Sequence, residues 1–307
     1  MAKWILKAIV QKAISFLPAK ERVNFFFQKY VTRGVDLTDE HLGYKLDAAR
    51  DHIRYFEKYG TVARAEARTL ELGTGWYPIV PLMLYLNGFG QTVSIDIRKW
   101  TSKERQLTGI ARLLDYHDRG LLSTYFDAID SERVEVLREI LAHPHAYDEQ
   151  RINERIGLET RIMDATRLDF PARSFDLICS NNTFEHIYPN VLRRILEEFK
   201  RVLKPTGVMS HFIDLSDHFA HLDGSIGIYN FLRFTEAQWA LIDNDIQPQN
   251  RLRWPDYVAM YQDLEIPIRE EEIRAGDPAA LEQVPLAAPY RSYPAEQVAI
   301  SHGYLIT

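Results

Sequence analysis

The segment "TLELGTGWYPIVPLML", residues 69–84, contains the turn that most constrains the fold class. It opens with a short apolar run typical of a buried strand, and Gly73-Thr74-Gly75 follows directly. Glycine has no Cβ and tolerates positive φ, so this turn lets the backbone approach a ligand closely. In dinucleotide-binding folds a third glycine makes room for a pyrophosphate. Trp76 and Tyr77 fill that place here, which favours an adenosyl ligand without phosphates.

Downstream of this turn, short apolar runs alternate with helical patterns, which indicates an α/β sheet. A first strand is predicted at 68–73 and a short helix at 78–87. Further strands are predicted at 91–97, 160–166, 174–182 and 208–215, and 296–307 alternates like a last antiparallel strand. The apolar face of residues 190–204 predicts a helix that ends at Pro205 and Gly207.

Two regions exceed a minimal α/β domain. Residues 1–65 look helical throughout and are predicted to form an N-terminal helical cap on a main domain at 66–307. The second region lies between the ends of two strands, Asp96 and Asp164, where the chain is about twice as long as a strand-helix-strand step needs. We therefore expect inserted helices at about 101–155. Residues 268–294 have loop-like Pro and Gly density.

The composition is that of an ordinary globular protein. Of 307 residues 46% are apolar, and Lys+Arg 37 against Asp+Glu 43 gives a net charge of -6. This balance argues against a general polyanion binder, so no nucleic acid partner is expected. The single cysteine, Cys179, can form no internal disulfide, which suits a reducing compartment and a cytoplasmic location.

The N-terminal segment is locally basic and partly apolar. Lysines interrupt its apolar positions and no cleavage site follows, so neither a signal peptide nor a spanning helix is expected. Residues 1–17 instead predict an amphipathic helix that packs on its own domain or on a sister subunit in a homodimer, or contacts a membrane surface. The basic residues of this region are Lys3, Lys7, Lys12, Lys20, Arg22, Lys29 and Arg33.

Carboxylates at two further strand ends suit an adenosyl ligand. Asp96 ends the second strand 21 positions beyond Gly75, where it can accept hydrogen bonds from both ribose hydroxyls. Asp164-Ala165 ends the third strand, where a carboxylate with a small neighbour can hold an adenine amino group.

These motifs resemble the class I S-adenosylmethionine-dependent methyltransferases. The resemblance covers roughly residues 66–215 and extends more loosely to residue 307. It rests on "LELGTG" (70–75), "SIDI" (94–97), "MDATRLDFPARSFDLICSNNTFEHI" (163–187) and "EEFKRVLKPTGVM" (197–209). It implies a Rossmann-like seven-stranded sheet with an antiparallel last strand. It also implies S-adenosylmethionine as methyl donor, with S-adenosylhomocysteine as its product.

The resemblance further implies the cofactor residues. They stand at the strand ends: Glu71, Gly73, Gly75, Asp96, Asp164, Ala165 and Asn181. The two glycines are expected to flank the methionine moiety, and Glu71 to hold its amino group through a water. The aspartates take the ribose and, with Ala165, the adenine, and Asn181 lines the cofactor near the methyl group. Tyr77 departs from the family pattern, which often has a third glycine there, and this affects the shape of the loop.

Methyl transfer needs an aligned acceptor and a group that removes any proton the acceptor loses. Three histidines after strands four and five are candidates for this role: His186, His211 and His218. The Glu185-His186 pair occurs in many relatives of this fold, which favours an architectural role for His186 over a direct one. Candidate substrate-binding residues are Trp76, Tyr77, Asp214, Tyr229 and Arg233. His218-x-x-His221 is a spacing common by chance, so no metal is expected.

The predicted function is methyl transfer to a small-molecule acceptor. A hydroxyl on a sugar or glycan, an amine, and a thioether of an amino-acid-like substrate all remain open. The alternatives are an RNA or protein methyltransferase, which the net charge of -6 disfavours, and a non-catalytic scaffold that binds the cofactor.

Overall fold

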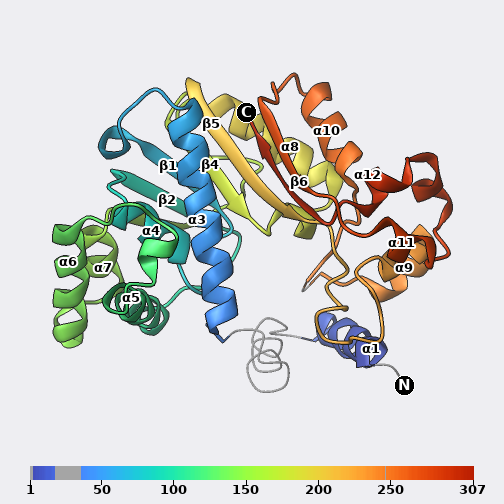
Figure 1. The fold of residues 1–307 in the computed structure, drawn as a ribbon, viewed down its shortest axis with the longest axis horizontal. Coiled ribbons are helices and arrows are strands. Elements are labelled where there is room, and N and C mark those ends of the chain that lie inside the picture. Colours follow the sequence, from blue (N-terminus) through green and yellow to red (C-terminus); the bar gives the residue numbers. More distant parts are fainter. Residues whose placement is uncertain (1–2, 18–35, 246) are drawn as a thin grey trace. The chain divides into compact units, whose positions relative to one another are not determined.

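The computed structural model describes residues 3–17, 36–245 and 247–307 (Figure 1). The basic residues Lys20, Arg22, Lys29 and Arg33 lie outside these ranges. The chain folds into two compact units, each described by itself. Of the described residues, unit 1 comprises those within 1–36, 182–193 and 212–305, and unit 2 comprises 37–181, 194–211 and 306–307.

Seven strands of the described residues form one mixed sheet in the order β3-β2-β1-β4-β5-β7-β6. Their bounds are β1 Arg68–Leu72, β2 Gln91–Asp96, β3 Leu158–Ile162, β4 Phe175–Asn181, β5 Leu203–Asp214, β6 Glu270–Arg274 and β7 His302–Ile306. Strands β1 to β4 pair in parallel, with Leu70 opposite both Val93 and Ile178. Backbone hydrogen bonds join Leu215 to Ser301 and Met209 to Thr307, so β7 runs antiparallel to β5. The predicted seven-stranded sheet with an antiparallel last strand is confirmed.

Helices cover both faces of the sheet in unit 2. On β5, Ser210 is hydrogen-bonded to His52 of α3 (Asp39–Tyr59), and the next residue, His211, stacks on Phe199 of α8 (Pro189–Val202). Successive strand residues point to opposite faces, so α3 and α8 lie on opposite sides of the sheet. Helix α4 (Ile79–Leu86) packs against α3.

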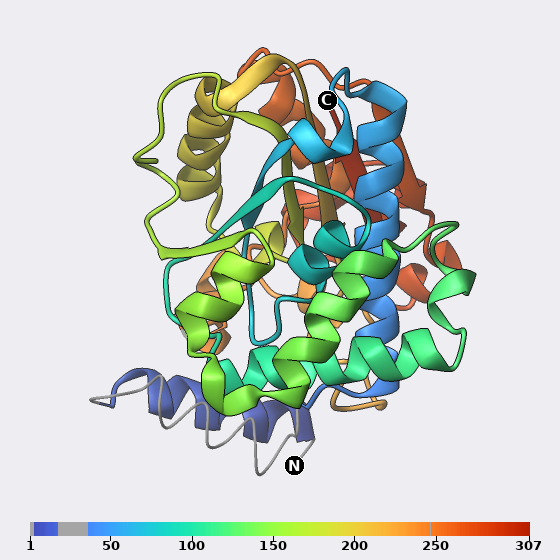
Figure 2. The same ribbon diagram turned by 90° about the vertical axis from the view of Figure 1, so that its left-hand side faces the viewer.

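Residues 101–155 contain helices, as their periodicity predicts. These are α5 (Lys103–Asp118), α6 (Ser131–Ala142) and α7 (Glu149–Arg155), drawn in green in Figure 2, where α6 and α7 pack against α5. Ser102, Asp130 and Asp148 cap the three N-termini, because each side chain accepts backbone N–H groups of the first turn.

Unit 1 packs short elements around an aromatic core. Its helices are α1 (Lys3–Ser15), α9 (Glu236–Ile242), α10 (Trp254–Asp263), α11 (Pro278–Glu282) and α12 (Ala295–Ala299). Trp239 and Phe231 are central to this core, and Ala8 of α1 packs on it. The fully buried Arg253 donates hydrogen bonds to three backbone carbonyls, those of Leu215, Val298 and Ile300.

The chain's end differs from the prediction. Residues 295–299 form α12, so the last strand starts at His302 rather than near 296. The physical reason is that the carbonyls of Val298 and Ile300 accept from the Arg253 guanidinium and not from a neighbouring strand.

Two other boundaries also differ. Helix α8 ends at Val202, and Pro205 and Gly207 lie inside β5 instead of ending the helix. The loop-like stretch 268–294 contains β6, whose "EEEIR" sequence is mostly exposed on an edge strand and therefore lacks an apolar pattern, and it also contains α11. The third strand ends at Ile162, two positions before Asp164.

Among the described residues, no helix combines the length and the apolar character needed to span a bilayer.

Candidate cofactor site and histidine cluster

The turn after β1 has the backbone shape that its glycines allow. Gly73 has φ +88° and Gly75 has φ +64°, a region that other residues rarely adopt. A Cβ added to Gly75 would meet no atom within 4 Å, so the backbone there faces open space. The Gly73 N–H donates to the Ile95 carbonyl of β2 and fixes the start of the turn. Gly75 therefore offers a ligand direct access to the main chain.

Glu71, two positions before the turn, is buried within the sheet. Its carboxylate accepts a hydrogen bond from Ser94, whose Oγ lies 2.6 Å from Thr74 Oγ1. Burial raises the pKa of Glu71 to about 7, although the Ser94 bond and the charge of Lys45 oppose this shift. Near neutral pH, a cationic group of a ligand would therefore draw Glu71 into its charged form.

Asp96 ends β2 and is tied to the same turn. Its Oδ1 accepts from the backbone N–H of Arg98 at 3.2 Å and from Trp100 Nε1 at 3.0 Å, and the Gly75 N–H also bonds to this carboxylate. Burial raises the pKa of Asp96, and these donors oppose the rise. A carboxylate has about four acceptor positions, and the N–H groups of Gly75, Ile97 and Arg98 and Trp100 Nε1 already donate to Asp96, so ribose hydroxyls would share or replace some of these bonds. The sequence analysis missed Trp100.

Trp76 is held beside this carboxylate. Its ring lies against Trp100 with centroids 4.5 Å apart, and the Arg105 guanidinium lies 4.5 Å from the Trp76 ring centre. Arg105 also donates to the Trp100 carbonyl. Tyr77 is half-buried next to it. The packed residues that replace the third glycine thus stiffen the loop.

The remaining predicted cofactor residues are at the ends of β3 and β4. Asp164 is exposed, and its Oδ1 accepts from the Thr166 N–H at 2.9 Å, which lowers the pKa of this carboxyl. Ala165 and Asn181 are buried. All seven predicted cofactor residues therefore belong to unit 2 and to the carboxyl ends of β1–β4, the edge where open α/β sheets bind ligands.

These residues fit S-adenosylmethionine. The open space at Gly75, the Asp96 carboxylate and the buried Glu71 suit a backbone contact, a ribose and an ammonium group respectively. Residues 135–210, which include α7, β3, β4 and α8, match a family model described as a methyltransferase domain. Residues 135–210 therefore match a methyltransferase domain, and S-adenosylmethionine is the cofactor that the residues of this site fit.

Three solved structures similar to this chain have low sequence identity to it. A putative sarcosine dimethylglycine methyltransferase from Galdieria sulphuraria is 14% identical, with 92% of this chain and 96% of that chain covered and a TM-score of 0.47. The 1,6-didemethyltoxoflavin-N1-methyltransferase of Burkholderia thailandensis, solved with S-adenosylhomocysteine, is also 14% identical, with 93% and 85% covered and a TM-score of 0.47. The PH0226 protein of Pyrococcus horikoshii is 16% identical, with 61% and 65% covered and a TM-score of 0.37. A search of curated proteins finds no match.

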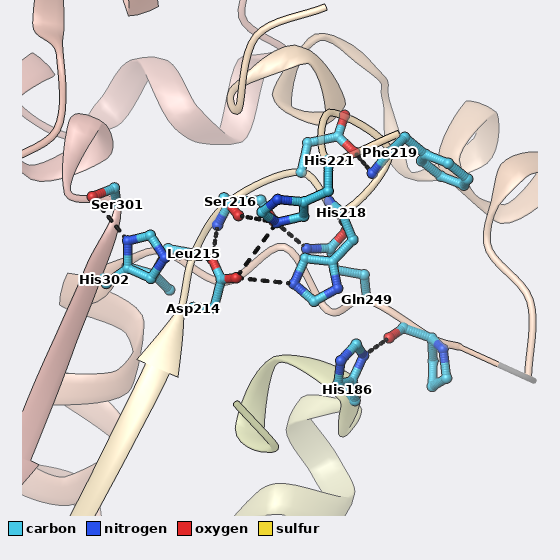
Figure 3. A network of polar contacts seen from close by, with 12 residues as sticks. His186, Asp214, Leu215, Ser216, His218, Phe219, His221, Gln249, Ser301 and His302 are labelled. Carbon is cyan, nitrogen blue, oxygen red and sulfur yellow. Dashed lines mark hydrogen bonds and ion pairs between the residues drawn. The ribbon is translucent and has the colours of Figure 1, made fainter. Parts of the chain in front are cut away.

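Unit 1 of this chain contains a cluster of histidines around Asp214, the last residue of β5 (Figure 3). Asp214 Oδ2 lies 3.3 Å from His218 Nε2 and 3.8 Å from His221 Nε2, and Oδ1 lies 3.3 Å from His302 Nε2. Burial acts to raise the pKa of Asp214, but the surrounding histidines outweigh it and the pKa falls well below its usual range.

His186 lies next to this cluster, with its ring 4.8 Å from that of His218. Its Nδ1 is 2.7 Å from the Pro248 carbonyl, which can only accept, so Nδ1 bears the hydrogen. Burial and the neighbouring His218 lower the pKa of His186 to about 4. The ring is therefore neutral at pH 7, with the lone pair on Nε2.

His211 occupies a different environment. It is fully buried in the sheet of unit 2, stacks on Phe199 and lies 2.8 Å from Ser180 Oγ through Nδ1. Burial lowers the pKa of His211 well below its usual value. This enclosure favours a packing role, and the structure does not group His211 with His186 and His218.

Two predicted substrate residues also have structural partners. The Tyr229 hydroxyl is buried, donates to the Ala299 carbonyl and accepts from the Asp277 N–H, both at 2.8 Å. Arg233 is exposed near the Phe234 ring. The sequence analysis missed His302, because only the antiparallel pairing of β7 with β5 brings it to Asp214.

Proposed function

We propose that this chain transfers a methyl group from S-adenosylmethionine to a small-molecule acceptor. The proposal rests chiefly on the pair formed by Asp214, the last residue of β5, and His218 in the segment that directly follows. In open α/β sheets, residues after the carboxyl ends of the strands face bound ligands. A histidine oriented by a carboxylate can accept a proton near neutral pH.

The nature of the acceptor atom determines which residues matter. A hydroxyl loses its proton during transfer, so a sugar or glycan hydroxyl needs a base, for which His186 and His218 are the candidates. A thioether loses no proton and needs only alignment. Trp76 and Tyr77, both half-buried, supply aromatic faces for a cationic sulfonium or ammonium product.

The setting of the enzyme is proposed on more general grounds. The net charge of -6 and the absence of a disulfide partner for Cys179 support a cytoplasmic enzyme without nucleic acid partners. Helix α1 buries Ala8 and Ile14 and exposes Leu6 and Ile9, and Phe16, just after the helix, is also exposed. This exposed apolar side supports contact with a second chain in a homodimer or with a membrane surface.

A labelled methyl donor tests the proposal against panels of amino acids, thioethers, nucleotide sugars and catechols. Label should move to at least one class of small molecule, and for a hydroxyl acceptor His218→Ala should reduce turnover while His145→Ala, an exposed histidine, should not. Full turnover in both His186→Ala and His218→Ala would exclude proton removal by these side chains. Label found only in protein or RNA would reject the small-molecule assignment.

A further inference from the structure

We propose that Asp214, His218 and His221 form a binding site for a divalent transition metal ion, with zinc as the best fit. These residues belong to unit 1, and one ligand atom from each lies within 4.8 Å of the other two. None of the seven predicted cofactor residues belongs to this site. Asp214 and His218 are also the pair on which the proposed function rests, and with an ion bound His218 Nε2 would coordinate the ion instead of accepting a proton. The site is therefore tested by ion binding and not by methyl transfer. The His218-x-x-His221 spacing alone did not predict a metal site. The fold adds Asp214 beside the two histidines and so supplies a third ligand.

The distances between the side chains support a metal better than direct hydrogen bonds. An N–H···O bond usually measures about 2.7–3.2 Å, and His218 Nε2 and His221 Nε2 lie 3.3 and 3.8 Å from Asp214 Oδ2. His221 Nε2 also lies 3.3 Å from Ser216 Oγ, a contact that an ion would replace. Zinc binds nitrogen and oxygen at about 2.0–2.2 Å in a tetrahedron, so neighbouring ligand atoms stand roughly 3.3–3.5 Å apart. Among the described residues, the buried Nε2 of His218 has no well-formed hydrogen bond.

The contacts of Asp214 orient its two oxygens differently. Oδ1 accepts from the Ser216 N–H at 2.7 Å and faces His302 Nε2 at 3.3 Å. Both His218 and His221 face Oδ2, as Figure 3 shows. Oδ2 would therefore bind the ion, while the contacts of Oδ1 with Ser216 and His302 fix the orientation of the carboxylate. Such outer partners commonly orient the ligands of metal sites.

The ligand set indicates the ion and its coordination. Two imidazoles and one carboxylate suit zinc and other first-row transition metals better than magnesium or calcium, which prefer oxygen alone. Three protein ligands leave one position of a tetrahedral ion for water or an oxygen of a small molecule. The His221 side chain is 62% exposed, which gives an ion a route from solvent.

Cobalt(II) and zinc(II) are the probes for this site. Full-length protein treated with a chelator should bind one ion per chain in calorimetry, and Co²⁺ should give the visible absorption of a low-coordinate site. His218→Ala and His221→Ala should each weaken binding by more than about 100-fold, since removing an outer partner alone commonly costs 10–100-fold. His302→Ala should fall within that smaller range, and His145→Ala, an exposed histidine, should bind normally.

Several outcomes would overturn the assignment. Absence of Co²⁺ and Zn²⁺ binding in the native chain would refute the site. Undiminished binding in His221→Ala would also refute it, and loss in Glu185→Gln with normal binding in His221→Ala would assign the ion to the neighbouring group Glu185, His186 and His218. Circular dichroism and S-adenosylhomocysteine binding, measured on every variant, separate loss of the metal site from misfolding and from failure of the proposed methyl transfer.

Discussion

Replacing Asp96 by alanine should weaken S-adenosylhomocysteine binding by about 10- to 150-fold. This carboxylate is the only group at the end of β2 in the cofactor set, and its expected bonds to ribose hydroxyls are charge-assisted. Loss of a charged hydrogen bond costs about 1.5–3 kcal/mol, and about 1.4 kcal/mol corresponds to a factor of ten. Calorimetry at pH 7 measures the change directly. Asp127→Ala, which removes an exposed carboxylate, controls for the change in net charge.

A second variant separates ribose binding from loop shape. Asp96 also accepts from Trp100 Nε1 at 3.0 Å, so Asp96→Ala removes a support of the loop as well as a ligand contact. Trp100→Phe removes that donor and keeps an aromatic ring beside Trp76, and we expect it to weaken binding by less than tenfold. Equal losses in Asp96→Ala and Trp100→Phe would mean that Asp96 acts only through the loop. An affinity within twofold of wild type in Asp96→Ala would refute the cofactor assignment.

Three further predictions concern the turn after β1, the buried Glu71 and the buried Arg253. Gly75→Ala and Gly120→Ala both add a Cβ at positive φ where no atom lies within 4 Å, so each should lower the free energy of unfolding by about 1–2 kcal/mol. Only Gly75→Ala should also weaken S-adenosylhomocysteine binding in calorimetry. Equal affinities of the two variants would show that Gly75 does not contact the cofactor. The pKa of Glu71 is about 7 in the folded chain and 4.5 for an unperturbed carboxyl, so the folded chain holds this proton more tightly. The contribution of Glu71 to the free energy of unfolding is therefore fully present below pH 4.5 and is lost as the pH rises through 7, by about 3 kcal/mol in total. Urea unfolding at pH 5 and pH 8 should show this loss diminished in Glu71→Gln, and an unchanged pH dependence would contradict the shifted pKa. Arg253→Met leaves three buried backbone carbonyls without a hydrogen-bond donor and should lower the free energy of unfolding by about 3–5 kcal/mol. Arg291→Met replaces an exposed arginine with one carbonyl partner and should lower the same free energy by less than about 1 kcal/mol. Similar losses in both variants would show that the buried position of Arg253 contributes nothing to stability.

The cofactor edge could be predicted from sequence because its determinants are local. The strands β1, β2 and β4 are buried runs, and a residue predicted to bind the cofactor stands at the end of each run, as Gly73 and Asp96 do for β1 and β2. In a parallel sheet the carboxyl ends meet at one edge, so sequence order alone gathers these residues. The shape of the loop was not predictable in the same way, because it depends on Trp76 meeting Trp100 and Arg105 from later elements.

The geometry of the histidine cluster of unit 1 could not be predicted from local sequence patterns. His218 and His221 lie close to Asp214 in sequence and were recognisable as a group, but their role depends on the direction of the Asp214 carboxylate. That direction is set by the Ser216 N–H and by His302, which arrives through the antiparallel return of β7. Position 302 falls within a stretch whose sequence pattern predicted a strand from 296, and the buried Arg253 makes its first half a helix instead. Long-range contacts fix both the start of β7 and the direction of the Asp214 carboxylate. The chemistry of this cluster could therefore not be predicted from the His-x-x-His spacing alone.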